Sequence, residues 1–142
     1  MNIEQIAFAS ALALAAVGSA LGTGAAGMAS IGAWKKCFME NRPAPFLLVA
    51  FVGAPLSQTI YGMILMNQII AATQTDPMAK LAAGVLGGIA IGFSAFSQGR
   101  AGAKGADALA ETGKGFGNYI MVVGVIETVA LFVMVFLMGI LK

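Results

Sequence analysis

The stretch NYIMVVGVIETVALFVMVFLMGIL, residues 118–141, decides the class of this protein. It is almost entirely apolar, and it is longer than the roughly 20 residues that an α-helix needs to cross a hydrocarbon core of about 30 Å. One carboxylate, Glu127, nevertheless lies near its middle. The stretch therefore predicts a membrane-spanning helix that carries an ionisable group inside the bilayer.

The rest of the chain has the same character. Of its 142 residues, 59% are hydrophobic and only 10% are charged, whereas soluble proteins carry about 25% charged residues. The alternating pattern of membrane β-barrel strands does not occur in the sequence. Four apolar stretches are each long enough to span a bilayer: residues 3–33, 43–73, 78–99 and 116–141. We predict an all-α membrane protein with four transmembrane helices.

Basic residues predict the orientation of these helices. Most of them lie in the two segments that follow the first and third apolar stretches: Lys35, Lys36, Arg42, Arg100, Lys104 and Lys114. Because lysine and arginine concentrate in cytoplasmic loops, we predict both of these connections in the cytoplasm and both termini outside. The first stretch has no basic segment before it and is too long for a signal peptide, so we expect it to be a permanent helix.

The second half of the chain repeats the first. Residues 51–63 align with residues 122–134, and the glycines of the first stretch align with those of the third: Gly18, Gly22 and Gly32 with Gly88, Gly92 and Gly102. Small residues at intervals of four let membrane helices pack closely. We predict a single membrane domain made of a duplicated helical hairpin, with residues 1–73 and 78–142 as its repeats.

Two glycine-rich motifs resemble nucleotide sites. GTGAAG (22–27) fits the dinucleotide fingerprint, but that motif functions between a strand and a helix, and here it lies inside one apolar stretch. ETGKGFG (111–117) lacks the spacing of a P-loop. The chain also has no histidine and a single cysteine, which excludes histidine-based metal sites and an internal disulfide. We expect no bound nucleotide.

Polar groups from three helices share one depth in the membrane. Glu127 and Gln58 lie equally far along the chain from the outer ends of their helices, at Lys142 and Thr73, and Gln98 lies only slightly further from Lys80. At about 1.5 Å per residue, all three lie roughly 22–27 Å from those outer ends. An intramembrane carboxylate is costly unless it has partners, so we expect these side chains to meet.

The second stretch supplies further polar groups. Ser57 and Tyr61 are four residues apart and share a helix face with Gln58 beside them, and Pro55 disturbs the preceding turn. A carboxylate, amides, a hydroxyl and a backbone carbonyl suit a hard monovalent cation. A proton site would need only Glu127 and one or two partners. The sequence also leaves open that the glutamines only join helices and that Tyr61 only packs.

These features together resemble a known family. The glycine-rich duplicated hairpin, IETVALF (126–132) and PLSQTIYG (55–62) are similar to the proteolipid (c or K) subunit of V-type and A-type rotary ATPases, sodium-coupled bacterial members in particular. The resemblance implies a non-catalytic protein that forms a homo-oligomeric ring in the plasma membrane of a prokaryote. It also implies the other partners: membrane lipids, central-stalk subunits and a stator subunit with an essential arginine, but no nucleic acid.

The resemblance further implies a Na⁺ site, with H⁺ as the alternative coupling ion. Its ligands would be the side chains of Ser57, Gln58, Gln98 and Glu127 and the backbone carbonyl of Ala54. Tyr61 would donate a hydrogen bond to Glu127 and hold it in a locked position. Leu56 stands where the first repeat would carry a second glutamate, so we expect one ion per chain and a role in ATP-driven pumping.

Two other classes fit less well. A small drug or cation antiporter would also use one intramembrane glutamate, but it would need an aromatic-lined cavity, and aromatic residues are only 8% of this chain. A purely structural or channel-forming protein with four spans would not need polar groups matched in depth. We therefore favour an ion-carrying protein of the rotor ring.

Overall fold

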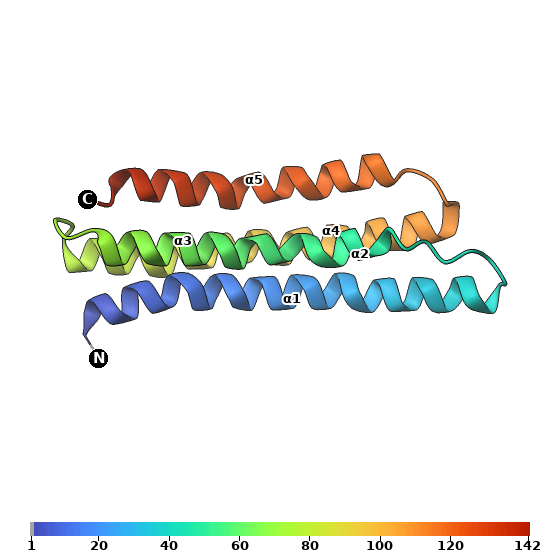
Figure 1. The fold of residues 1–142 in the computed structure, drawn as a ribbon, viewed down its shortest axis with the longest axis horizontal. Helices are drawn as coiled ribbons and strands as arrows, with labels where there is room; N and C mark the ends of the chain where they lie inside the picture. Colours follow the sequence, from blue (N-terminus) through green and yellow to red (C-terminus); the bar gives the residue numbers. More distant parts are fainter. Residues whose placement is uncertain (1) are drawn as a thin grey trace.

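The computed structural model describes residues 2–142 as a bundle of long helices, with no strand among them. The helices are α1 (Ile3–Met39), α2 (Leu48–Gly53), the 3₁₀ turn η1 (Ala54–Leu56), α3 (Ser57–Ala71), α4 (Pro77–Thr112) and α5 (Phe116–Ile140). α2, η1 and α3 form one span, so four helices are long and apolar enough to cross a membrane, as the sequence predicts. Both termini lie at one end, and the links from α1 to α2 and from α4 to α5 lie at the other (Figure 1).

Local sequence explains where the helices begin and end. Asn2 caps α1 in a capping box with Gln5. Asp76 caps α4 by accepting from two backbone N–H groups, and Pro77 follows as the first helical residue. Gly113 ends α4 with a φ of 67°, a left-handed conformation that glycine adopts without steric cost. The start of α1 and both ends of α4 therefore lie at residues that favour helix termini.

Two helices are longer than the apolar stretches that predict them. α1 continues beyond residue 33 to Met39, and α4 continues beyond residue 99 to Thr112. With 37 and 36 residues, they are roughly 55 Å long, well above the thickness of a hydrocarbon core of about 30 Å. The apolar stretches do not mark these helix ends, because hydropathy marks the edge of the bilayer, whereas charged residues also form helices.

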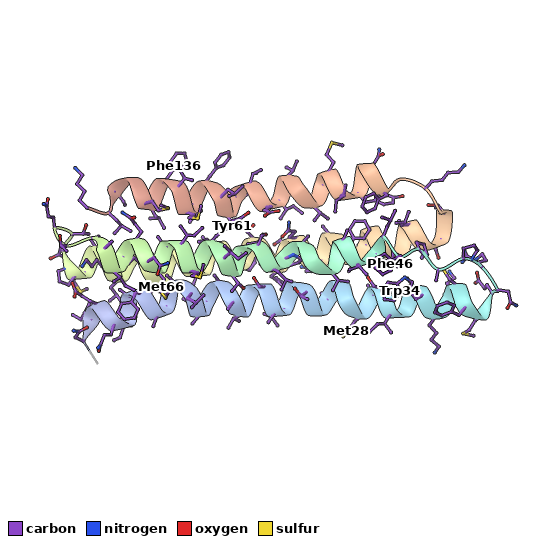
Figure 2. The ribbon with its side chains drawn as sticks, in the orientation of Figure 1. Met28, Trp34, Phe46, Tyr61, Met66 and Phe136 are labelled. Carbon is purple, nitrogen blue, oxygen red and sulfur yellow. The ribbon has the colours of Figure 1, made fainter. Side chains whose placement is uncertain are left out.

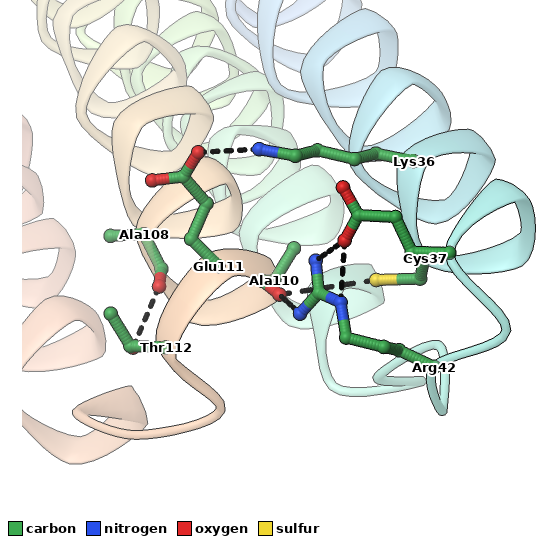
Figure 3. Close-up of polar contacts among 8 residues, drawn as sticks. Lys36, Cys37, Arg42, Ala108, Ala110, Glu111 and Thr112 are labelled. Atoms are coloured by element: carbon green, nitrogen blue, oxygen red, sulfur yellow. Dashed lines mark hydrogen bonds and ion pairs between the residues drawn. The ribbon is translucent and has the colours of Figure 1, made fainter.

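The extended ends of α1 and α4 are joined by polar contacts. Lys36 forms an ion pair with Glu111 at 2.6 Å, and Arg42 donates to the carbonyl of Ala110 at 2.9 Å while it pairs with Glu40 (Figure 3). This end of the bundle is thus tied together by residues that the charge pattern assigns to the cytoplasm.

Glycines bring α1 and α4 into backbone contact within the membrane region. A Cβ placed on Gly18 would lie 2.0 Å from the Gly92 carbonyl oxygen, and one on Gly22 would lie 2.3 Å from the carbonyl oxygen of Ala95. Real atoms cannot approach so closely, so only glycine fits. The GTGAAG motif lies inside uninterrupted α1, where Gly22 packs against α4 instead of preceding a helix N-terminus.

We expect Gly18→Ala to destabilise the bundle because the added methyl group would separate α1 from α4. Forcing extra atoms into a packed core costs about 1–3 kcal/mol, occasionally more. Gly24→Ala is the matched control, since a Cβ there has no atom within 4 Å. Thermal unfolding in detergent should show a clear loss for Gly18→Ala and little change for Gly24→Ala. Equal melting temperatures would contradict the backbone contact.

α5 is the least buried of the long helices. Only Val123, Ala130 and Met134 are buried along its 25 residues, and large apolar side chains cover its outer face, with Phe136 69% exposed and pointing away from the bundle (Figure 2). An apolar face of this extent suits lipid or further protein copies. The glutamate of α5 therefore lies on a helix at the periphery of the bundle.

Candidate ion-binding site

Pro55 shapes the part of the span that faces the other helices. Proline has no N–H and cannot continue the α-helical hydrogen bonding, and here α2 and α3 are separated by the single 3₁₀ turn η1. In this turn the backbone N–H of Ser57 donates to the Ala54 carbonyl. The Ser57 hydroxyl lies 3.0 Å from the same carbonyl oxygen. The turn thus places a hydroxyl beside a backbone oxygen at the start of α3.

Two glutamines fill the interior beside this turn. Gln58 and Gln98 are both 0% exposed. The Gln58 Nε2 donates to the Gln98 Oε1 at 2.7 Å, and the Gln58 Oε1 lies 3.1 Å from the Ser57 hydroxyl. Buried amides need such partners, because an unpaired amide in an apolar interior is costly. α3 and α4 are therefore joined by a direct amide-to-amide contact.

Glu127 completes the cluster from α5. The Tyr61 hydroxyl donates to its Oε1 at 2.5 Å, and Gln98 Nε2 donates to its Oε2 at 3.2 Å. The same amide donates to the Val123 carbonyl at 3.1 Å. Figure 2 shows Tyr61 between α3 and α5, near the middle of the bundle. Glu127 is half-buried, so its carboxylate is enclosed by protein on one side only.

The structure brings together every residue that the sequence analysis selected. One chain of hydrogen bonds, with the carbonyl of Ala54 at its end, joins the side chains of Ser57, Gln58, Gln98, Glu127 and Tyr61. Their role as ion ligands stays a prediction. The contact between Tyr61 and Glu127 shows that this phenol does more than pack.

Sequence reasoning missed two contributors to the cluster. One is the Val123 carbonyl, which accepts from Gln98. The other is Ser94, whose hydroxyl donates to the Ile126 carbonyl at 2.9 Å. Ser94 precedes Gln98 by four residues and so shares its helix face, which is a usable signal. Backbone acceptors such as that of Val123 carry no signal in the sequence.

The side chains of this cluster offer a carboxylate, two amides and two hydroxyl groups as possible ligands. Within residues 2–142, no group of three or more histidine, cysteine, aspartate or glutamate side chains could hold a metal ion. Soft and transition metals prefer thiolate and imidazole ligands, whereas carboxylate, carbonyl and hydroxyl oxygens suit hard cations. One carboxylate balances one positive charge. The cluster can therefore bind one proton or one monovalent cation, whose charge balances that of the Glu127 carboxylate.

Comparison with known proteins finds a family match for the second hairpin of the chain. Residues 81–140, which contain Gln98 and Glu127, match the family model that describes the C subunit of ATP synthase. The match covers the second hairpin of this chain, which is therefore similar to that family. This confirms the resemblance to a c or K proteolipid, and the match agrees with the predicted non-catalytic role.

A curated relative extends the match over most of the chain. The chain is 32% identical over 124 residues to the A-type ATP synthase subunit K of Methanocaldococcus jannaschii. The aligned segment is 86% of this chain and 54% of that protein, so the chain spans about half the length of the relative it matches. The similarity thus includes most of the first hairpin, which the family model does not cover. Whether the chain is coupled to sodium stays a prediction.

Proposed function

We propose that this chain is the ion-carrying component of the membrane ring of a rotary ATPase and that Glu127 carries Na⁺ across the membrane. The observation that supports this most is the convergence of three spans on one intramembrane carboxylate, through Tyr61, Gln98 and, behind it, Gln58. The family of the second hairpin supports the ring role. Identical copies would complete the ring, and the chain itself would catalyse no reaction.

The arrangement of oxygens favours Na⁺ over H⁺. The Ala54 carbonyl and the Gln58 Oε1 both lie close to the Ser57 hydroxyl oxygen, at 3.0 and 3.1 Å. Oxygens at such spacing can bind one hard cation together. A proton would need Glu127 and its direct partners alone, and Ser57 would then not contact the carried ion. The Gln98 Oε1 and a carboxylate oxygen of Glu127 would complete a set of five ligands.

One observation supports H⁺ as the alternative. The amides of Gln58 and Gln98 satisfy each other without an ion, so their burial alone does not require a cation. In that reading the network only orients Glu127, and the proton would be the ion that neutralises it. The two readings predict different responses to Na⁺, which makes them separable by experiment.

The position of Glu127 is suited to rotation through lipid. A neutralised carboxyl group can face hydrocarbon, whereas a bare carboxylate there costs at least about 2.5–3.5 kcal/mol. A loaded copy could therefore turn through the bilayer and an empty one could not. Discharge would need a counter-charge, which we assign to an arginine of a separate stator subunit, and central-stalk subunits would transmit the rotation.

The first hairpin contributes ligands but no second carboxylate. Leu56 stands at the position that repeat alignment pairs with Glu127, and it is 54% exposed on the bundle surface. One ion per four helices lowers the number of ions moved per turn of the ring. More free energy from each ATP is then available per ion, so we propose that the complex works as an ATP-driven pump. We place both termini outside a prokaryotic plasma membrane.

The test is ATP-driven ²²Na⁺ uptake by inverted membrane vesicles that contain the complete ATPase. If Na⁺ is the coupling ion, uptake should persist when a protonophore collapses the proton gradient, because no proton gradient is needed. If H⁺ is the coupling ion, ATP should acidify the vesicles and the protonophore should abolish any Na⁺ uptake. The second result would overturn the sodium assignment and leave the ring role in place.

A further inference from the structure

Within α5 itself, the hydrogen bonds from other helices are confined to one turn. Just beyond its last residue, the Leu141 carbonyl accepts from Gln68 and the Lys142 carbonyl accepts from Thr75. In the part of the chain that the structure describes, four hydrogen bonds run from side chains of other helices to groups within α5, and all four end between residues 123 and 127. Above and below this turn, α5 is held by apolar contacts with few buried side chains. These four bonds are therefore the polar contacts that act directly on the turn that carries Glu127.

Ser94 makes the one bond of the four that does not come from a predicted ion ligand or from Tyr61. Ser94 is 6% exposed, and its hydroxyl donates to the Ile126 carbonyl at 2.9 Å. Ile126 directly precedes Glu127. Gln98, one turn further along α4, donates to the carbonyl of Val123. Two side chains of α4 thus hold the backbone of the glutamate turn at two points.

The bonds differ in how they depend on the ion. Tyr61 and Gln98 touch the carboxylate itself, so their hydrogen bonds change when Glu127 gains or loses its ion. Ser94 contacts only a backbone carbonyl, which keeps its charge distribution throughout. Its hold on α5 is therefore available in every state of the site.

We propose that Ser94 is a positioning residue that keeps the Glu127 turn aligned with Tyr61 and Gln98 whether or not an ion is bound. The proposal rests on the function proposed above for Glu127. Without the Ser94 hydroxyl, the turn is free to rotate away from α4, and the contact from Gln98 Nε2 to Glu127, already 3.2 Å, lengthens further. The carboxylate then loses hydrogen-bond donors, and its ion no longer has a fixed position.

Ser97 provides a matched control on the same helix. Both serines border a shallow cavity of about 330 Å³ between α4 and α5, but the Ser97 side chain makes no hydrogen bond to another described residue. Removing the Ser97 hydroxyl therefore takes a hydroxyl from the same cavity without breaking a hydrogen bond to α5. Ser94→Thr keeps the hydroxyl, and the adjoining cavity has room for the added methyl group.

The experiment measures carbodiimide labelling of Glu127 in membranes that contain the complete ATPase, first against pH without Na⁺ and then against Na⁺ concentration. For Ser94→Ala, we expect the pH of half-maximal labelling to rise by about half a unit and the Na⁺ concentration for half-protection to rise about three- to tenfold, as the loss of one aligned hydrogen bond implies. Ser94→Thr and Ser97→Ala should match the native protein in both curves.

The proposal is overturned if Ser94→Ala leaves both curves unchanged or if Ser97→Ala shifts them equally, because a general effect on helix packing would not distinguish the two serines. If Ser94→Ala fails to assemble, Ser94→Cys takes its place, because a thiol is similar in shape to a hydroxyl and is a weaker donor. This variant must then shift both labelling curves in the same direction. A native protein that Na⁺ does not protect would refute the sodium assignment, whereas the pH curves without Na⁺ would still decide the role of Ser94.

Discussion

Replacing Glu127 by glutamine is expected to reduce ATP-driven ion uptake to background while the membrane ring still assembles. Glutamine has nearly the same shape and keeps an oxygen for the Tyr61 hydroxyl, which lies 2.5 Å from the Glu127 Oε1 in the native protein. It cannot exchange a proton or balance a cation, so no ion is carried. Uptake of ²²Na⁺ and acidification of the same vesicles measure the loss for either ion.

Glu111→Gln is the control for this change. Glu111 lies at the extended end of α4, exposed and paired with Lys36, far along the helix from the intramembrane cluster. We expect this variant to keep most of its transport. Substantial uptake by Glu127→Gln, or an equal loss in both variants, would contradict the assignment of the carrier to Glu127.

Replacing Gln98 by leucine is expected to abolish protection of Glu127 by Na⁺ and to leave carbodiimide labelling itself intact. Gln98 is fully buried and contacts Gln58, Val123 and Glu127. Leucine fills similar space but offers no oxygen. The Na⁺ affinity should therefore fall by about 10–100-fold or more, since loss of even a supporting partner has that effect at metal sites. Labelling persists because it requires only the acid.

Gln68→Leu is the matched control for this substitution. Gln68 also lies on a membrane-spanning helix, but it donates to the Leu141 carbonyl at 3.3 Å, just beyond the C-terminal end of α5 and away from Glu127. Its loss removes an interhelical hydrogen bond without removing a proposed ligand. If Gln98→Leu keeps native protection by Na⁺, Gln98 only links helices, and the result favours H⁺ as the coupling ion.

The sequence was sufficient for the architecture because membrane helices follow simple physical rules. Apolar stretches of sufficient length predict the four spans, and glycines four residues apart predict close helix packing, which the structure shows between α1 and α4 at Gly18 and Gly92. It was insufficient for the helix ends, since Met39 and Thr112 lie beyond the apolar stretches. Hydropathy records where lipid ends, and the helix continues for as long as capping and ion pairs support it.

The site was predictable to the level of side chains but not to the level of bonds. Depth along the helix was enough to bring Gln58, Gln98 and Glu127 together, because a helix rises by a constant amount per residue. Which atoms meet depends on rotation about each helix axis. That rotation decides that Gln98 spans from Gln58 to Val123 and that Ser94, rather than Ser97, reaches α5.

The most direct test of Glu127 as a Na⁺ carrier is its carbodiimide labelling, mapped by mass spectrometry, across a grid of pH and Na⁺ concentration. Among the six acidic residues, Glu127 alone should be labelled, because it is the only one near the middle of an apolar span. Na⁺ should slow this labelling competitively, and more strongly as pH rises, since Na⁺ and H⁺ compete for one carboxylate. Labelling mainly at Glu40 or Glu111 would refute the site, and labelling of Glu127 that millimolar Na⁺ leaves unchanged near neutral pH would show that the site carries protons.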